Sequence, residues 1–397
     1  MAFAKDIVIL EGARTPVGTF GGAFRKVTAT QLGAHAGKAA IARAKISPND
    51  IDNVVIGNVL QTSSDAVYIA RHIGLECEIP REVPALTVNR LCGSGLQAVV
   101  TAAQGIMLDE SQCALAGGTE NLSQAPHVLY GARWGLELGQ DGRLQDSLWA
   151  ALVDSHSGLS MALTAENLAE RYEISRQAQD EFAFRSQQTA LAAMREGRLA
   201  EEIVPTPGHG KRGEAVEVTQ DEHPRPDSSL ESLARLKARF KEGGTVTPGN
   251  ASGINDAAAA LVISSSQFAE ARGLQPIGRL VSWAVVGVDP KIMGIGPAPA
   301  IRAALKRADL TLDEMDLIEV NEAFAAQYLA VEKELRLDRD RVNVNGGAIA
   351  LGHPLGASGT RLALTLLYEL RRRQGRFGVA ALCIGGGQGI AAVFERL

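Results

Sequence analysis

The sequence predicts an α/β protein, and three observations lead to that class. Short runs rich in β-branched residues alternate with alanine-rich segments, which is the rhythm of strands joined by helices. The 397 residues include 42 glycines and only 5% aromatic residues, as expected where backbone layers pack closely and turns are tight. The chain also repeats itself weakly, which indicates that the fold is built from two similar halves.

The predicted strands and helices follow one another along the chain. The helix over 96–108 is the clearest, because its apolar residues recur at helical spacing and share one face. A glycine turn precedes this helix, and an apolar strand precedes the turn. The expected elements are strand 7–10, helix 31–44, strand 54–56, strand 86–88, helix 96–108, helix 301–308, strand 317–320, helix 360–370 and strand 379–383.

The internal repeat consists of three matches in the same order. The first aligns without a gap, and both of its copies run directly into an apolar strand. One such match could arise by chance among small residues, but three in order favour an ancient duplication. The matching segments are 41–52 with 305–316, 88–89 with 344–345, and 114–118 with 381–386.

Residues 123–249 look different from the two halves. They hold two of the three tryptophans and a polar loop rich in glycine and proline. Such an insertion commonly carries substrate contacts, although a role in solubility or at an interface fits the sequence equally well. We predict three regions, which are a first half of residues 1–122 with 250–275, an inserted loop domain of 123–249, and a second half of 276–397.

Charge and cysteine content exclude several classes of protein. A net charge of -5 gives no basic field for nucleic acid, and the basic run at 371–373 is typical of a solvent-facing helix end. The four cysteines are scattered without a C-x-x-C pair, so neither a disulfide framework nor a zinc site is expected. No apolar run is long enough to cross a bilayer, and an early strand leaves no room for a signal peptide. We expect a soluble intracellular protein.

Cys92 is the first candidate for chemistry. It lies in Asn89-Arg-Leu-Cys92-Gly-Ser-Gly95, between an apolar strand and a helix. The macrodipole at a helix N-terminus favours the thiolate, so we expect the pKa of Cys92 to be lowered. The alternative is a small buried cysteine in a glycine turn.

His353 is the second candidate. It lies in the segment 343–359, which contains five glycines and leads into a helix. Because His353 stands between Gly352 and Pro354, we expect an irregular, rigid loop that presents the ring to a cleft as a base or hydrogen-bond donor. A phosphate-binding loop is the competing interpretation, but the sequence has no G-x-x-x-x-G-K-[ST] motif here.

Two further segments combine an apolar strand with polar or glycine-rich ends. Cys383 ends one such strand, and the glycines 385–387 after it can expose N–H groups of the kind that an oxyanion site needs. Asn321 and Glu322 form a polar pair at the end of another strand. Cys92 and Cys383 are therefore expected to occupy equivalent turns of the two halves.

Together, the segments around Cys92, Asn321, His353 and Cys383 resemble the four signature segments of the thiolases, in the same order and spacing. The resemblance covers essentially the whole chain, and four such segments in combination are highly specific. Over long stretches it is greatest to the mitochondrial type of 3-ketoacyl-CoA thiolase, the acetyl-CoA acyltransferases of fatty-acid β-oxidation.

The resemblance implies two βαβαβαββ halves packed as five layers, α-β-α-β-α, with the loop domain inserted in the first. Cys92 would carry the acyl group as a thioester, His353 would activate it, and Cys383 would move the proton at the α-carbon. His353 and a water held by Asn321 would bind one thioester oxygen. The N–H groups of Cys92 and Gly385 would form a second oxyanion hole.

The resemblance also implies the binding partners. Arg225, Ser228, Ser252 and Met161 match positions that contact coenzyme A, which is a substrate, and no metal or redox cofactor is required. Assembly as a homodimer or homotetramer is expected, without nucleic acid or membrane partners. The expected compartment is the cytoplasm of a bacterium, or the mitochondrial matrix if the source is eukaryotic.

The function implied is CoA-dependent cleavage of 3-ketoacyl-CoA to acyl-CoA and acetyl-CoA, with the reverse Claisen condensation. The runner-up is a biosynthetic acetyl-CoA C-acetyltransferase that makes acetoacetyl-CoA. Such enzymes commonly carry a histidine where this chain has Ser160, which disfavours a strict acetoacetyl-CoA specialist. A decarboxylating ketoacyl synthase would need a second catalytic histidine. A non-catalytic acyl-CoA or lipid carrier is disfavoured because Cys92 and His353 are both present.

Overall fold

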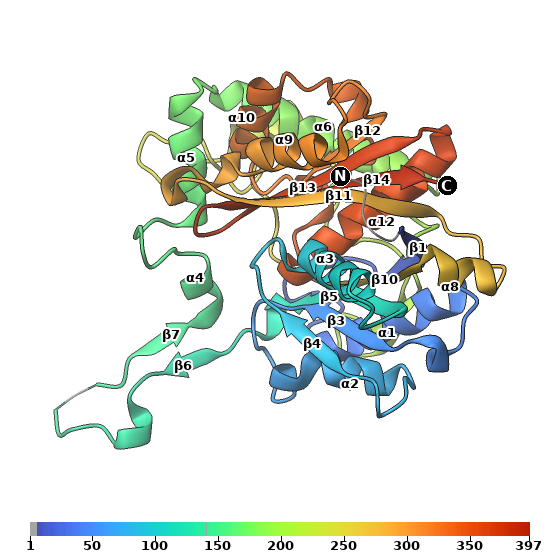
Figure 1. Ribbon diagram of the computed structural model, residues 1–397. Helices are drawn as coiled ribbons and strands as arrows, with labels where there is room; N and C mark the ends of the chain where they lie inside the picture. The colour runs from blue at the N-terminus through green and yellow to red at the C-terminus, as the bar shows by residue number, and fades with distance from the viewer. Residues whose placement is uncertain (1–5, 140) are drawn as a thin grey trace.

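The computed structural model describes residues 6–139 and 141–397. This part of the chain contains a ten-stranded mixed sheet in the order β12-β13-β14-β11-β1-β10-β5-β3-β4, with β2 (Gly18–Thr19) paired to β10. Helices lie on the outer faces of the sheet and also between its two halves (Figure 1). The predicted α/β class is confirmed.

The two halves of the sheet have the same strand order. In the first, β3 lies parallel between β4 and β5, and β10 is antiparallel to β5 and β1. In the second, β12 is parallel to β13, and β14 is antiparallel to β13 and β11. The strands are β1 (Ile7–Arg14), β3 (Asn53–Gly57), β4 (Ala85–Val88), β5 (Cys113–Asn121), β10 (Asn255–Ser265), β11 (Gly278–Gly287), β12 (Leu317–Val320), β13 (Phe377–Ile384) and β14 (Gln388–Arg396).

This topology confirms the predicted duplication. The matched segments 41–52 and 305–316 each join the end of a helix to the strand at the corresponding place, β3 or β12. A single bridge between Ile318 and Val342 stands where β4 pairs with β3 in the first half. The halves also share hydrogen bonds, because β1 pairs with β11 near Ile7.

Three groups of helices complete the five predicted layers. The outer layer of the first half is α1 and α2, the central layer is α3 and α12, and the outer layer of the second half is α9 and α10 (Figure 1). One apolar core joins the central helices to both half-sheets, which is why α12 is buried from Leu355 to Leu370. The helices are α1 (Ala29–Arg43), α2 (Ile69–Glu76), α3 (Ser94–Met107), α9 (Pro297–Ala308), α10 (Ala325–Leu335) and α12 (Leu355–Arg373).

The predicted elements are all present, with ends that differ by a few residues. The largest difference is at α12, which begins at Leu355 instead of Thr360. The backbone carbonyl of Pro354 accepts hydrogen bonds from the N–H groups of Ala357 and Ser358 at 3.0 Å each. The helix therefore starts directly after the histidine loop.

The region 123–249 packs against the second half, where α5 and α6 share a core with α10. The hairpin of β6 and β7 projects from the body as an arm (Figure 1). The domain boundaries given above stay a prediction. The remaining elements are α4 (Ser147–Ala151), α5 (Met161–Arg171), α6 (Arg176–Arg195), α7 (Leu230–Ala234), α8 (Ser266–Ala271), α11 (Ala348–Leu351), β6 (His127–Leu129), β7 (Leu144–Asp146), β8 (Thr206–His209) and β9 (Ala215–Val218).

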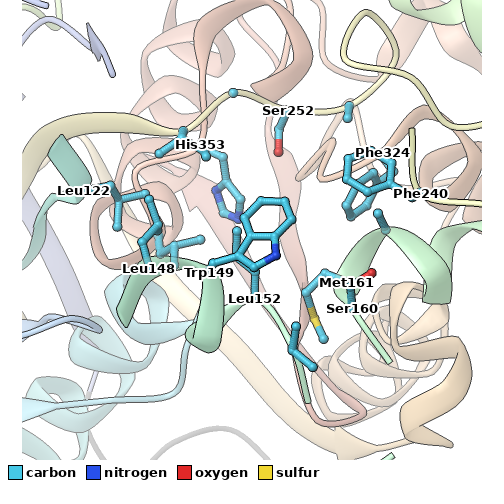
Figure 2. Close-up of a pocket in the computed structure, with 16 residues that line it drawn as sticks. Leu122, Leu148, Trp149, Leu152, Ser160, Met161, Phe240, Ser252, Phe324 and His353 are labelled. Atoms are coloured by element: carbon cyan, nitrogen blue, oxygen red, sulfur yellow. The ribbon is translucent and has the colours of Figure 1, made fainter. Parts of the chain in front are cut away.

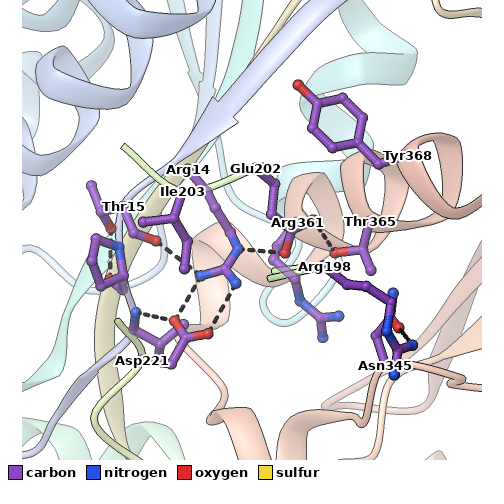
Figure 3. Close-up of polar contacts among 12 residues, drawn as sticks. Arg14, Thr15, Arg198, Glu202, Ile203, Asp221, Asn345, Arg361, Thr365 and Tyr368 are labelled. Atoms are coloured by element: carbon purple, nitrogen blue, oxygen red, sulfur yellow. Dashed lines mark hydrogen bonds and ion pairs between the residues drawn. The ribbon is translucent and has the colours of Figure 1, made fainter. Parts of the chain in front are cut away.

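A buried arginine ties this region to the first half (Figure 3). Arg14, at the end of β1, is 1% exposed. Its Nε donates to Glu202 at 2.7 Å, and its two terminal nitrogens donate to Asp221 at 2.7 and 2.9 Å. Removal of one partner of such a buried ion pair costs about 3–5 kcal/mol. Among the described residues, no helix is both long and apolar enough to span a membrane.

Candidate active site

Cys92 lies in the turn between β4 and α3. Leu91, directly before it, has a φ of 46°, which is uncommon for a bulky residue and marks a strained turn. Gly93, directly after it, packs so closely on β13 that an added Cβ would lie 2.6 Å from Ile384. The turn therefore presses Cys92 against the end of β13, the strand that carries Cys383.

The sulfur of Cys92 receives hydrogen bonds from the backbone N–H groups of Gly385 and Cys92 itself. Burial nevertheless raises the pKa of Cys92 to about 11, because the lost hydration of a thiolate outweighs these two donors. The predicted lowering of this pKa is therefore wrong. In the free protein Cys92 is a neutral thiol beneath two convergent amides, which is the donor arrangement of an oxyanion hole.

His353 lies in the short link between α11 and α12, as expected for an irregular loop. Gly352 has a φ of 102°, and an added Cβ there would lie 2.4 Å from the side chain of Asn255. The same Asn255 side chain accepts the backbone N–H of His353 at 3.1 Å. Burial and the nearby Arg361 lower the pKa of His353 to about 3, so its imidazole is neutral at physiological pH.

Asn321 follows β12 and is fully buried. Its Nδ2 lies 3.3 Å from Nε2 of His353, so the predicted pairing of these two residues is present. Within the described residues, Oδ1 of Asn321 has no hydrogen-bond partner. A buried carbonyl of this kind is a natural position for an ordered water.

Cys383 lies in β13, paired with Gly389 across the hairpin whose turn is formed by the glycines 385–387. It is fully buried against Met293 and Ala323. Burial raises the pKa of the Cys383 thiol, and the nearby Cys92 raises it further. The structure therefore brings the two cysteines together at the junction of the halves.

The expectation that the two cysteines occupy equivalent turns is wrong. Cys92 precedes α3, and the counterpart of α3 in the second half is α12, which follows His353. Cys383 instead lies in β13, whose counterpart is β5. The similar letters around the cysteines reflect small residues at close backbone contacts, and these recur at different topological positions.

An apolar cavity of about 140 Å³ opens beside His353 (Figure 2). Predicted substrate residues Met161 and Ser252 line it, and Met161 also packs against Gly385. Cys92 contacts this cavity's wall, because it packs with the lining residues Leu122, Leu148 and Leu355. The other apolar residues that line the cavity are Trp149, Leu152, Phe240, Ile254 and Phe324.

Arg225 and Ser228, the other predicted CoA contacts, line a second and more polar pocket of about 180 Å³. The two pockets share one wall, because the segment 249–253 borders both of them. At Gly253, an added Cβ would lie 2.3 Å from the ring of His223, which lines the second pocket. A ligand with a polar head and a long flexible arm could therefore occupy both.

Several residues of the site were missed from the sequence. Glu120 is fully buried and accepts the N–H groups of Val59, Leu60 and Gly356, and burial raises its pKa to about 7. Burial, and then Arg225, lower the pKa of His223 to about 4. The sequence offered one usable signal, a glutamate directly after the glycine pair at 117–118 in an otherwise apolar strand.

Comparison with known proteins defines the class. Residues 7–267 match the thiolase N-terminal domain, and residues 274–396 match the thiolase C-terminal domain. The chain belongs to the thiolase family.

Among its relatives, the human mitochondrial 3-ketoacyl-CoA thiolase is 51% identical over 100% of this chain and 99% of that protein. The beta-ketothiolase BktB of Cupriavidus necator is 49% identical over 99% of this chain and 100% of its own length. A crystal structure of the human mitochondrial 3-ketoacyl-CoA thiolase in complex with CoA has a TM-score of 0.97 at 50% identity, over 100% of this chain and 99% of that one. The Bacillus anthracis acetyl-CoA acetyltransferase has a TM-score of 0.96 at 46% identity, over 100% of both chains.

Proposed function

We propose that this thiolase cleaves 3-ketoacyl-CoA with free coenzyme A, giving a shortened acyl-CoA and acetyl-CoA, and that it also catalyses the reverse Claisen condensation. The observation that carries the proposal is the meeting of Cys92, under two backbone amides, with Cys383 beside the cavity lined by His353. The polar pocket around Arg225 supports coenzyme A as the group that is bound.

In the cleavage direction, Cys92 attacks the ketone carbon while its proton moves to neutral His353. The N–H groups of Cys92 and Gly385 stabilise the resulting oxyanion, a contribution of about 3–4 kcal/mol per donor. The bond between C2 and C3 then breaks, and Cys383 protonates the enolate to give acetyl-CoA. Free coenzyme A finally takes the acyl group from Cys92.

The elevated thiol pKa values suit this sequence of steps. Cys383 must hold a proton until an enolate forms, and a buried thiol whose pKa is raised remains protonated at physiological pH. His353 and a water at the unpaired Oδ1 of Asn321 are placed to bind the thioester oxygen of that enolate. We propose that no metal or redox cofactor takes part.

We propose that the substrate range extends beyond four carbons. The cavity beside His353 is lined almost entirely by apolar side chains, and the residue before Met161 is the small Ser160. Steady-state thiolysis across 3-ketoacyl-CoA chain lengths tests this. If kcat/KM for acetoacetyl-CoA exceeds that for a 3-ketooctanoyl substrate more than about tenfold, or ~1.4 kcal/mol, the biosynthetic function is the better one.

Ser160 allows a matched pair of variants. Its hydroxyl caps α5 by accepting the N–H of Leu163 at 3.3 Å, and it also borders the cavity. Ser160→His fills that space and is expected to depress activity on 3-ketooctanoyl-CoA more than on acetoacetyl-CoA. Ser160→Ala removes the cap, at a stability cost of about 1 kcal/mol, but leaves the chain-length preference unchanged.

The runner-up function, a biosynthetic acetyl-CoA acetyltransferase, has its own support. The Syntrophomonas wolfei acetyl-CoA acetyltransferase is 48% identical over 99% of this chain and 100% of that protein. Both functions share the Cys92 intermediate, so the chain-length comparison separates them. Incubation with acetyl-CoA separates either from a non-catalytic carrier, since only an enzyme gains a covalent acetyl group.

We propose that the chain assembles with copies of itself through the arm of β6 and β7. Trp134 and Leu138 on this arm are 89% and 106% exposed, and apolar side chains gathered at a projecting hairpin are typical of an interface. Trp134→Asp with Leu138→Asp should lower the mass found by light scattering from a tetramer to a dimer. The compartment is proposed to be the matrix for a eukaryotic source and otherwise the cytoplasm.

A further inference from the structure

Ser358 lies in the first turn of α12 and is 2% exposed. Its hydroxyl oxygen is 2.7 Å from Nδ1 of His353 and 2.9 Å from the backbone carbonyl oxygen of Pro354. The hydroxyl is thus in direct contact with the ring that is proposed to activate Cys92. Neither of the two pockets includes Ser358, so it has no direct role in binding substrate.

The hydrogens in this cluster can be assigned one by one. A carbonyl oxygen can only accept, so the single hydrogen of the Ser358 hydroxyl points to Pro354. The serine oxygen must then accept from His353, which places the ring's proton on Nδ1. Nε2 is left bare, and the N–H of Asn321 at 3.3 Å can donate to it.

We infer that Ser358 is a positioning residue that holds the neutral His353 with its proton on Nδ1 and its basic Nε2 free for the Cys92 proton. The inference rests on the proposed thiolase mechanism. Among the described residues, Ser358 and Asn321 are the hydrogen-bond partners of the ring. An uncharged partner suits this role, because a carboxylate at Nδ1 would favour an imidazolium that could accept no proton.

The charged groups around the cluster agree with a neutral ring. Arg361, on the next turn of α12, opposes a positive charge on His353. Glu120, from β5, accepts the N–H of Gly356 rather than contacting the ring. The nearest acid is therefore spent on the backbone at the start of α12, and the tautomer is left to Ser358.

The tautomer can be observed directly in the unmodified enzyme. Solid-state ¹⁵N spectra of protein labelled at its seven histidines, with His353 assigned by its loss in His353→Asn, should show a protonated Nδ1 and a bare Nε2 at neutral pH. A protonated Nε2 in the free enzyme would overturn the inference, whatever the variants do. The proposed function would be unaffected, since thiolysis by the same sample reports it independently.

Variants then test the consequence. Ser358→Ala should mix the tautomers and slow acetylation of Cys92 by acetyl-CoA on the order of 10- to 100-fold, with KM for coenzyme A unchanged. Ser358→Thr keeps the hydroxyl and should restore most of the rate. Thr360→Val is the matched control, because Thr360 lies on the same helix, is fully buried, and its hydroxyl lacks a partner among the described residues.

Acetylation of Ser358→Ala at the wild-type rate would contradict the inference, and so would an equal loss in Thr360→Val. The pH profile separates positioning from folding. Loss of the acceptor at Nδ1 makes the imidazolium less stable, so the apparent pKa of His353 falls below its already low value of about 3. The acetylation rate of Ser358→Ala should thus be reduced by the same factor from pH 6 to pH 9. A purely structural defect would instead vary with the stability of the variant.

Discussion

The starts of α3 and α12 are corresponding places in the two halves of the fold, yet they carry different chemistry. Cys92 precedes α3 and is half-exposed, whereas His353 precedes α12 and is 5% exposed. Each side chain lies at the first turn of a central helix, and the duplication brings both turns to one place. The comparison teaches that a symmetric scaffold can supply a nucleophile and a base from equivalent positions once the residues diverge.

Glycines allow the two helix starts to approach each other. A Cβ added at Gly118 would lie 1.8 Å from the carbonyl oxygen of Gly356, and one added at Gly95 would lie 2.6 Å from the same atom. No side chain fits between these backbones. The distance between the nucleophile turn and the histidine turn is therefore set by backbone contact, which is stiffer than side-chain packing.

Removal of the nucleophile should have the largest effect. Cys92→Ala is expected to abolish acyl transfer, because no other cysteine lies under the two amides of Cys92 and Gly385. Peptide mass analysis after incubation of wild-type enzyme with acetyl-CoA should place the acetyl group on Cys92. Label found only on Cys77 or Cys113 would contradict the assignment.

Loss of the second cysteine should separate the two steps. Cys383→Ala is expected to retain acetylation of Cys92, since thioester exchange breaks no C–H bond, but to lose cleavage and condensation by about 10²- to 10⁴-fold. It should also fail to exchange the α-hydrogens of acetyl-CoA with deuterated water. Near-normal thiolysis by this variant would mean that Cys383 only packs in β13.

The pH dependence of alkylation tests the environment of Cys92. Since its pKa is raised to about 11, the thiolate fraction grows tenfold with each pH unit below that value. Iodoacetamide should therefore modify Cys92 about 100-fold faster at pH 9 than at pH 7, and still faster than the buried Cys77, whose pKa burial raises to about 12. A plateau below pH 8 would indicate the thiolate that the helix dipole was first expected to favour.

Two glycine substitutions should have small and opposite effects on stability. Gly118→Ala forces apart the starts of α3 and α12 and should cost about 3 kcal/mol, together with activity. Gly105→Ala, inside α3, meets only Asn53 at 3.5 Å and should stabilise the protein by about 1 kcal/mol. Chemical denaturation measures both. Equal losses would show that α3 tolerates no added methyl group anywhere.

Much of this architecture could be predicted from local patterns. The strands and helices, the duplication and the four chemical segments are written in short stretches of sequence, so Cys92, Asn321, His353 and Cys383 could be named before they were seen together. The raised pKa of Cys92 could not, because burial depends on the packing of Leu122, Leu148 and Leu355 around it. The helix dipole was visible in the sequence, but the larger desolvation cost was not.

Contacts that depend on the fold were also beyond the sequence. The roles of Glu120 and Ser358 arise from partners in other segments or from the exact start of α12, and neither residue belongs to a pattern with one chemical meaning. The equivalence of Cys92 and His353 required the strand order. Sequence similarity had instead matched the two cysteines.

The strand order also has a consequence for synthesis on the ribosome. In the first half-sheet β1 pairs with β10, so an early strand waits for a partner that ends at Ser265. At translation rates of about 5–20 residues per second, roughly 10 to 50 seconds separate the two strands. During that interval β1 and β5 expose unpaired apolar edges, which favour aggregation. The nascent chain should therefore depend on holding chaperones until the inserted region has emerged.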